Sequence, residues 1–384
     1  MNVLEEVGKY AEHMIALRRD IHAHPELGWK EYRTQELICK ELDEIGLPYE
    51  KVCGTGVIAV LKGTQDRPVI GLRADMDALP VTEKNICSYT SQTPGVMHAC
   101  GHDCHTAILL TAARILCEHR EEVHCTIKFI FQPAEEVIQG GKAMSEQPQL
   151  ADLDHIFGAH VWSPLNVNNF CIEEGPRLAS ADNIYLTING LGAHGAEPHR
   201  GHDAIIAACA IVQAFQSIVS RNTDPLQPLV ITIGTINGGT ASNIIPAEVR
   251  LSGTVRSFSP EVRDDTQALL ERIAKQTAET YGCTCMFDYQ RCTPATINAP
   301  AETKKMRQAV IDLFGEKALK ALEKTTGGED FAWYLEKTPG AYMHIGARND
   351  ETGKNWPQHH ECYDVDEQAL VNGAAVLVQL GISI

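Results

Sequence analysis

The nine residues 97–105, Met-His-Ala-Cys-Gly-His-Asp-Cys-His, hold two thiols, three imidazoles and a carboxylate. Thiolates and neutral imidazoles are good ligands for zinc-like divalent ions. Gly101 lets the chain turn tightly enough for Cys100 and His102 to face a common point. An apolar run at 107–116 follows directly and predicts a helix whose unpaired N–H groups would favour a thiolate at Cys100. The spacing therefore predicts a metal site at the start of a helix.

Two pairs of carboxylates follow apolar segments that are typical of strands. Asp75 and Asp77 follow one such segment, and Glu135 and Glu136 follow another. In α/β sheets the functional sites gather at the carboxyl ends of strands. Adjacent glutamates after a buried strand cost desolvation energy unless a positive group compensates. A metal ion would do this, with one glutamate as ligand and the other free as a base; a solvated acidic loop explains the glutamate pair equally well when it is taken alone.

Strands alternate with helices through the first part of the chain. We expect helices at 4–23, 34–42 and 107–116 and strands at 56–61, 69–72, 126–131 and 156–161, the last of which carries His160. This alternation favours an α/β fold with a mixed, mostly parallel sheet covered by helices.

A second pattern begins near residue 181 and ends near 292. Its elements run strand, helix, strand, strand, helix, strand, which indicates a smaller α/β sandwich inserted in the first domain. After it we expect a helix at 301–313, a strand at 341–345 and a closing helix at 366–380. We therefore assign residues 1–180 and 293–384 to one domain and 181–292 to an inserted domain.

Composition excludes several classes of protein. The 384 residues are 44% hydrophobic and 22% charged, as in globular proteins that fold in water. We see no apolar run near the ~20 residues of a membrane helix, and no secretory signal at the N-terminus. A net charge of −17 argues against nucleic acid as a partner. The thirteen cysteines form no compact disulfide framework, so we expect reduced thiols and a cytoplasmic location.

The motifs together resemble one family. Four stretches, in this order along the chain, resemble the dinuclear-metal amidohydrolases: 73–77 (Arg-Ala-Asp-Met-Asp), 97–103, 132–136 (Gln-Pro-Ala-Glu-Glu) and 193–195 (Ala-His-Gly). That family includes aminoacylases, hippurate hydrolases, indole-acetyl-amino-acid hydrolases and, more distantly, carboxypeptidase G. The resemblance runs from about residue 19 to the C-terminus.

The resemblance implies a site with two divalent metal ions. The ligands that it implies are Cys100, His102, Glu136, His160 and His359, and the catalytic base is Glu135. His359 is chosen because the family's last histidine stands four residues before an aromatic residue and eight before a glutamate, here Tyr363 and Glu367. The neighbouring His360 departs from the family pattern and is the alternative ligand. Zinc or manganese is favoured and cobalt or nickel is tolerated. Asp77 is expected to orient a ligand histidine, while Asp75 fits either a ligand or a supporting role.

The resemblance also implies the reaction. A metal-activated water would cleave the amide bond of an N-acyl amino acid, with an acetyl, benzoyl or arylacetyl group, and Glu135 would act as general base and then general acid. His194, Asn243 and Arg256 match the substrate-side groups: His194 would donate to the oxyanion and Arg256 would bind the substrate carboxylate. In relatives the inserted domain is a lid that also forms a homodimer.

Two other functions remain open from the residues. A thiol hydrolase would use Cys100 as nucleophile with His102 or His105 as base, but it leaves His160 and the glutamate pair unexplained. A catalytically silent metal-binding protein on the same fold is the other alternative, and the complete set of ligands and base argues against it. Sensitivity to a chelator separates the metal enzyme from the thiol hydrolase.

Overall fold

The computed structural model describes all residues, 1–384, and the chain divides into two compact units. Unit 1 comprises Met1–Gly175, Ile297–Glu323 and Asp330–Ile384, and unit 2 comprises Pro176–Thr296 and Lys324–Glu329. The segment Lys324–Glu329, which the sequence analysis assigned to the first domain, belongs to unit 2, because Thr325 bridges to Leu178 and Gly327 O accepts from Ala179 N.

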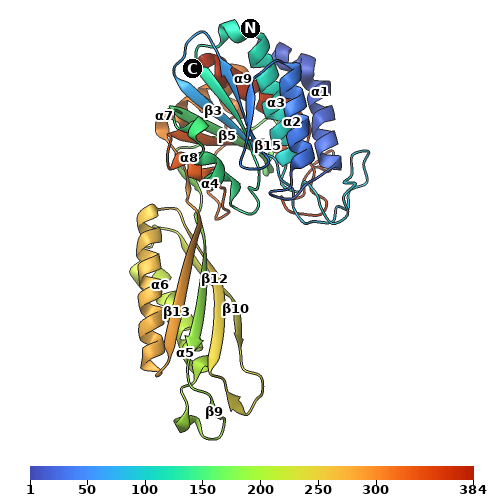
Figure 1. Cartoon of the computed structure of the whole chain (residues 1–384). Coiled ribbons are helices and arrows are strands. Elements are labelled where there is room, and N and C mark those ends of the chain that lie inside the picture. The colour runs from blue at the N-terminus through green and yellow to red at the C-terminus, as the bar shows by residue number, and fades with distance from the viewer. The chain divides into compact units, whose positions relative to one another are not determined.

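A seven-stranded sheet forms the centre of unit 1. Its order is β1 (Tyr49–Val52), β2 (Gly56–Lys62), β4 (Thr126–Gln132), β3 (Val69–Asp75), β5 (His155–Asn166), β15 (Gly340–Arg348) and β6 (Phe170–Cys171). The central strands β4, β3, β5 and β15 run parallel, and β1, β2 and β6 pair antiparallel to their neighbours. The predicted mixed sheet with a parallel centre is confirmed, and the carboxyl ends of the parallel strands meet at one edge (Figure 1).

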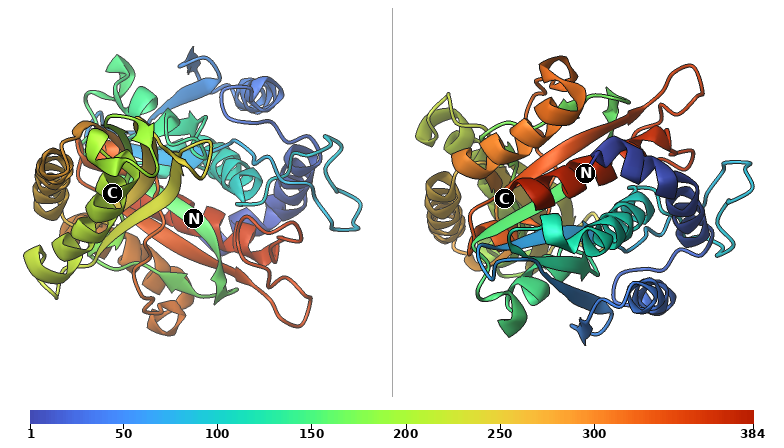
Figure 2. Two further views of the ribbon diagram at one scale, coloured as in Figure 1. Left: turned by 90° about the horizontal axis from the view of Figure 1, so that it is seen from below. Right: turned by 90° about the horizontal axis from the view of Figure 1, so that it is seen from above.

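Helices cover both faces of this sheet. On one side α1 (Val3–Ala23), α3 (His102–Glu118) and α9 (Gln368–Ser383) pack against one another, with α2 (Tyr32–Glu44) and α7 (Pro300–Phe314) beside them (Figure 2). Phe129 and Phe131 of β4 face the core formed with these helices, whereas the buried Ile130 points to the other side, as strand alternation requires. The short helices α4 (Gly140–Ser145) and α8 (Ala332–Leu335) contact each other and β4 or β15.

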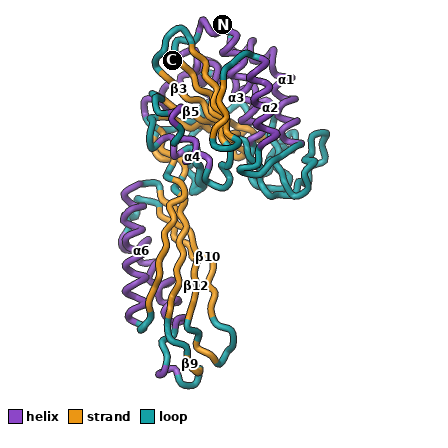
Figure 3. Tube along the Cα trace, in the orientation of Figure 1, coloured by secondary structure: helices purple, strands orange, loops and turns teal.

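Unit 2 is the small α/β sandwich that the sequence predicted. Its antiparallel sheet has the order β10 (Leu229–Gly238), β12 (Glu248–Ser257), β8 (Ala181–Asn189) and β13 (Thr284–Thr293), and α5 (Ala204–Ser217) and α6 (Pro260–Thr280) share its core (Figure 3). Asp203 and Ser259 cap these two helices by accepting from backbone N–H groups of the first turn. The short strands β9 (Ala193–His194) and β11 (Ile244–Ile245) pair with each other. A further two-stranded ladder joins β7 (Gly175–Leu178) and β14 (Thr296–Asn298).

One helix contradicts the expectation that no segment is long and apolar enough to cross a membrane. The helix Ala204–Asn222, which is α5 with the π turn that follows it, meets that criterion by length and composition. In the structure Ala207, Ile211 and Phe215 of this helix are buried in the core of unit 2. Burial against the sheet accounts for the apolar residues on that face of the helix.

Candidate metal centre

The turn before α3 presents Cys100 and His102 on the same side. Gly101 has φ of 102°, in the left-handed region, and a Cβ there would lie 2.4 Å from Val161 Cγ2. Only glycine fits both the backbone conformation and this close approach. The glycine that the sequence analysis singled out therefore places the two flanking side chains.

The five side chains expected to bind metal converge at the carboxyl ends of the parallel strands. Donor atoms of Cys100, His102 and His160 lie within 4.8 Å of one another, and so do those of Cys100, Glu136 and His359. Cys100 is common to both groups, and its Sγ is 3.3 Å from His160 Nε2. Two overlapping groups that share a thiol are suited to two neighbouring ions.

The rings of His102 and His160 are oriented so that their Nε2 atoms point toward the cluster. His102 Nδ1 is 3.2 Å from Asp77 Oδ1, and His160 Nδ1 is 2.6 Å from Val161 O. An imidazole held this way through Nδ1 offers Nε2 as the ligand atom. His102 Nε2 and Glu136 Oε1 are buried without a hydrogen-bond partner. Because buried polar atoms are normally satisfied, these residues fit divalent metal ions.

Asp75 and His105 support the cluster from behind. Asp75 pairs with His105 Nδ1 and with Arg73 Nη1, and His105 Nε2 accepts a hydrogen bond of 2.9 Å from Val161 N. Both nitrogens of His105 are therefore engaged within the protein. The sequence left open whether Asp75 is a ligand or a supporting residue. In the structure it makes supporting contacts to Arg73 and His105.

The structure separates the two adjacent histidines of the C-terminal motif. His359 has φ of +66°, and its Nε2 lies 3.5 Å from Glu136 Oε1. The His360 ring instead stacks on Trp356 at a centroid distance of 4.2 Å, and its Nδ1 accepts from Cys362 N. His359 thus joins the cluster, and His360 is engaged in its own loop.

Glu135 lies beside the cluster and is almost buried. Its Oε2 is 4.0 Å from His102 Nε2, and its Oε1 accepts a long hydrogen bond of 3.4 Å from Asp330 N. Asp330 is itself held by Arg73, at 3.0 Å. A carboxylate in this place can take a proton from a molecule held at the cluster.

Burial dominates the electrostatics of the metal-free cluster. It raises the pKa of the Cys100 thiol well above its usual range and the pKa of Glu136 to about 7, and it lowers the pKa of His160 and His359. The thiolate that we expected from the helix N-terminus is therefore not favoured unless a cation is present. A cysteine nucleophile needs a lowered pKa, and the pKa of Cys100 is shifted in the opposite direction.

The raised pKa of Glu136 predicts a pH dependence of stability. Its pKa rises from 4.5 to about 7, so the metal-free folded protein binds more protons than the unfolded chain between these values and loses stability as pH rises through them. In metal-free protein, Glu136→Gln should gain on the order of 3 kcal/mol relative to wild type between about pH 4.5 and about pH 8. Urea unfolding with a chelator present measures the free energy of unfolding of both proteins. A difference between Glu136→Gln and wild type that stays constant with pH would contradict the prediction.

The substrate-side residues all lie in unit 2. His194 pairs with Ile244, and Gly195 N donates to Asn243 O at 2.8 Å, so His194 and Asn243 lie together. Arg256 pairs with Val230 at the opposite end of β12, eight residues or roughly 27 Å from Glu248. Unit 2 of one chain therefore brings His194 and Asn243 together and leaves Arg256 at the other end of its sheet.

A buried ion network behind the cluster was missed by the sequence analysis. Arg18 is fully buried on α1, and it donates to Asp103 at 2.7 Å and to Asp364 at 2.9 Å. His22 also contacts Asp103 at 2.8 Å. The signal was an arginine within the apolar face of the 4–23 helix, since such a charge needs a buried partner. Asp103 thus links the start of α3 to α1, and Arg18 extends the network to Asp364 in the C-terminal loop.

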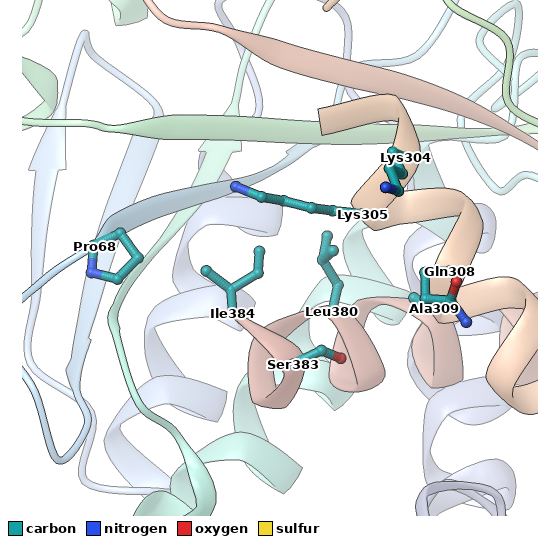
Figure 4. Close-up of a pocket in the computed structure, with 8 residues that line it drawn as sticks. All are labelled: Pro68, Lys304, Lys305, Gln308, Ala309, Leu380, Ser383 and Ile384. Atoms are coloured by element: carbon teal, nitrogen blue, oxygen red, sulfur yellow. The ribbon is translucent and has the colours of Figure 1, made fainter. Parts of the chain in front are cut away.

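A separate hollow in unit 1 contains none of the expected site residues. It has a volume of about 410 Å³ and lies between α7 and the end of α9. Figure 4 shows Lys305 extending across it toward Pro68, with Leu380 below. The hollow is therefore distinct from the metal cluster.

The helix-covered α/β sheet carries at its strand ends two candidate ligand groups that share a thiol, an arrangement suited to a dinuclear metal centre. Residues 71–382 match the model of the peptidase family M20/M25/M40, and the chain belongs to this family. The resemblance found from the motifs is thus confirmed.

Relatives include enzymes that act on acylated amino acids. The chain is 38% identical over 374 residues to an N-acetylcysteine deacetylase of Bacillus subtilis, covering 96% of each. It is also 38% identical over 374 residues to IAA-amino acid hydrolase ILR1-like 2 of Arabidopsis thaliana, covering 96% of this chain and 84% of that one. The crystal structure of YXEP of Bacillus subtilis, a dinuclear metal binding peptidase, superposes with a TM-score of 0.86 at 33% identity, covering 98% of both.

Proposed function

We propose that the protein hydrolyses the amide bond of N-acyl amino acids carrying an acetyl, benzoyl or arylacetyl group, releasing a carboxylate and a free amino acid. The observation that carries this proposal is the pair of ligand groups sharing Cys100 beside the nearly buried Glu135. The named activities of the deacetylase and the IAA-amino acid hydrolase support the substrate class. The thirteen free cysteines support a cytoplasmic location.

Two divalent ions would occupy the centre. Cys100, His102 and His160 would hold one, and Cys100, Glu136 and His359 the other. A thiol and imidazoles favour zinc, while the carboxylate tolerates manganese, cobalt or nickel. When bound, such ions lower the pKa of water and polarise an amide carbonyl. Asp77 would keep the His102 ring oriented through Nδ1.

Glu135 would move the proton. Its carboxylate would take a proton from the attacking water and pass it to the leaving amine nitrogen, so that one group acts as base and then as acid. Asp330 N donates to Oε1 of Glu135, and Oε2 lies 4.0 Å from Nε2 of the proposed ligand His102.

His194, Asn243 and Arg256 would act on the substrate. His194 is exposed and would donate to the oxyanion, with Asn243 beside it. The planar guanidinium fork of Arg256 could bind the α-carboxylate. Since His194 and Arg256 lie at opposite ends of the unit 2 sheet, we propose that one site takes His194 from a second copy of the chain.

The outer strand of unit 2 supports a homodimer. β10 is an edge strand of ten residues that is mostly exposed, and unpaired edges readily pair with another copy. Exposed apolar side chains on or near this edge include Val230, Ile236, Ile206 and Ile244. Covering them would remove apolar surface from water.

Mixed dimers test whether His194 acts between subunits. His194→Ala and Glu135→Gln should each be inactive, yet mixing them with subunit exchange should restore about one quarter of wild-type activity, because half of the dimers are mixed and each has one complete site. Activity is measured before and after exchange, with each variant exchanged against itself as control. No recovery in mixtures shown to contain mixed dimers would contradict the proposal.

A replacement at each of the two adjacent histidines tests the last ligand. His359→Ala should lower metal-dependent turnover by at least about 100-fold and weaken the binding of one ion, because an imidazole ligand is lost. His360→Ala is the matched control and should stay within about threefold of wild type, since its ring contacts only Trp356 and its own loop. Metal content and kcat are measured for both variants; the reverse order of effects would make His360 the ligand.

The proposed function itself is tested with a substrate panel. Purified protein is offered acetyl, benzoyl and indole-acetyl derivatives of amino acids, before chelation, after chelation and after zinc or manganese is returned. We expect turnover that disappears with the chelator and returns with the metal. Turnover that resists complete metal removal would favour Cys100 as a nucleophile, and metal binding without any turnover would favour the silent metal-binding protein.

A further inference from the structure

Two buried carboxylates hold three consecutive backbone N–H groups next to the metal cluster. Ala134 N donates to Glu31 Oε1 at 2.9 Å, and the N–H groups of Glu135 and Glu136 donate to the two oxygens of Asp77, each at 3.0 Å. Glu31 is 0% exposed and Asp77 1%. The backbone that carries the proposed base and a proposed ligand is therefore fixed at every amide.

The backbone at the first of these amides is strained. Ala134 has φ of +57°, in the left-handed region that disfavours residues with a Cβ. Such a conformation persists only where the surroundings hold it. A Cβ on Gly28 would lie 3.2 Å from Ala134 Cα, so the 25–30 loop packs directly against this turn. The Glu31 carboxylate is the acceptor that ties the Ala134 amide to that loop.

Burying the Glu31 carboxylate without a cationic partner costs folding free energy. Its other contacts are Thr55 Oγ1, which donates to Oε2 at 2.6 Å, and Trp29 N, which donates to Oε1 at 3.1 Å. No lysine, arginine or histidine forms an ion pair with it. Burial accordingly raises the pKa of Glu31, and a buried carboxylate without a cation costs folding free energy. The carboxylate is held by three hydrogen bonds, none of them from a cation.

We propose that Glu31 is a positioning residue for the amide hydrolysis: by holding the Ala134 amide it fixes the direction in which Glu135 presents its carboxylate. This inference rests on the proposed function, in which Glu135 is the base. Asp77 contacts both the Glu135 amide and His102 Nδ1. Glu31 and Asp77 together therefore align the proposed base Glu135 with the proposed ligand His102. Displacement of a reacting group by about 1 Å can cost about 100-fold in rate.

Three variants at Glu31 and one control separate positioning from charge and from stability. Glu31→Ala removes the acceptor, and Glu31→Asp keeps the charge but withdraws it by one methylene. Glu31→Gln keeps an oxygen for Ala134 N and can donate from its amide to Thr55 Oγ1. Thr55→Val is the matched control, because it removes a different partner, the Thr55 hydroxyl, from the same carboxylate. All four are assayed as metal-loaded full-length protein.

We expect Glu31→Ala and Glu31→Asp to lower kcat by about 100-fold with KM and bound metal unchanged. Glu31→Gln and Thr55→Val should stay within about fivefold of wild type, although Thr55→Val loses a buried hydrogen bond. If Glu31→Asp kept the wild-type kcat and Glu31→Gln lowered it, the negative charge of Glu31 would be what matters. That result would overturn the proposal. Equal losses in Glu31→Ala and Thr55→Val, or loss of metal from Glu31→Ala, would also overturn it.

Hydrogen exchange of the peptide covering 133–139 gives a readout that needs no substrate. Exchange at these amides should accelerate at least about tenfold in Glu31→Asp and Glu31→Ala and remain near wild type in Glu31→Gln and Thr55→Val. Unchanged exchange in Glu31→Asp would overturn the proposal even if the protein proved to hydrolyse no acylated amino acid. Failure of the substrate panel with the expected exchange pattern would instead count against the proposed function alone.

Discussion

Replacement of Glu135 by glutamine should lower kcat by at least about 10³-fold and leave the bound metal unchanged. Glutamine has nearly the same volume and can still accept from Asp330 N, which now donates to Glu135 Oε1. It cannot take a proton from water or return one to the amine. General acid and base catalysis contributes about 10² to 10⁴ in rate, and one residue would perform both steps here.

The measurement is kcat and KM on whichever panel substrate the wild type cleaves, together with metal content after dialysis. Glu361→Gln is a suitable control, because Glu361 is an exposed carboxylate that pairs with Lys84 at 2.6 Å, and its loss should change kcat by less than about twofold. Turnover by Glu135→Gln within tenfold of wild type would remove Glu135 from the role of base. Loss of metal would instead make Glu135 a ligand.

Replacement of Cys100 by alanine should abolish binding of both metal ions and reduce turnover below detection. Its Sγ is the donor atom common to the two ligand groups, so its loss removes a ligand from each. His160→Ala removes a ligand from one group only and should weaken mainly one ion. Since even a residue that only supports a ligand changes metal affinity by about 10 to 100-fold, loss of a shared ligand should exceed this for both ions.

Calorimetric titration of the metal-free protein measures this difference as a stoichiometry. We expect two ions for wild type, about one for His160→Ala and none for Cys100→Ala. Cys104→Ala is the matched control, because Cys104 is a buried cysteine of α3 in the hydrophobic core; it should keep two ions and lose only stability, by about 1 kcal/mol. Two ions in Cys100→Ala would show that the thiol is not shared between the sites.

The sequence predicted most of the fold because its signals are local. The apolar run before Asp75 became β3, which is buried throughout, and the apolar run after His102 became α3. The change of pattern near residue 181 marked the inserted sandwich, whose strands and helices have the predicted order. The segment Lys324–Glu329 was assigned differently, because its partners Leu178 and Ala179 lie nearly 150 residues away in the sequence.

Some features of the candidate metal site could be predicted from the sequence, and others are set by the tertiary structure. The sequence by itself predicted which residues could bind metal and that Gly101 allows a tight turn between Cys100 and His102, since both follow from chemistry and from a single backbone turn. The sequence favoured His359 and kept His360 as the alternative, and the tertiary structure places His359 beside Glu136, where His359 has a left-handed φ and its N–H donates to Ala99 O. The tertiary structure likewise decided that Glu31 holds Ala134, 103 positions along the chain. Spacing along a sequence specifies which face of an element a side chain occupies, whereas the partner across the fold is set by packing between distant segments.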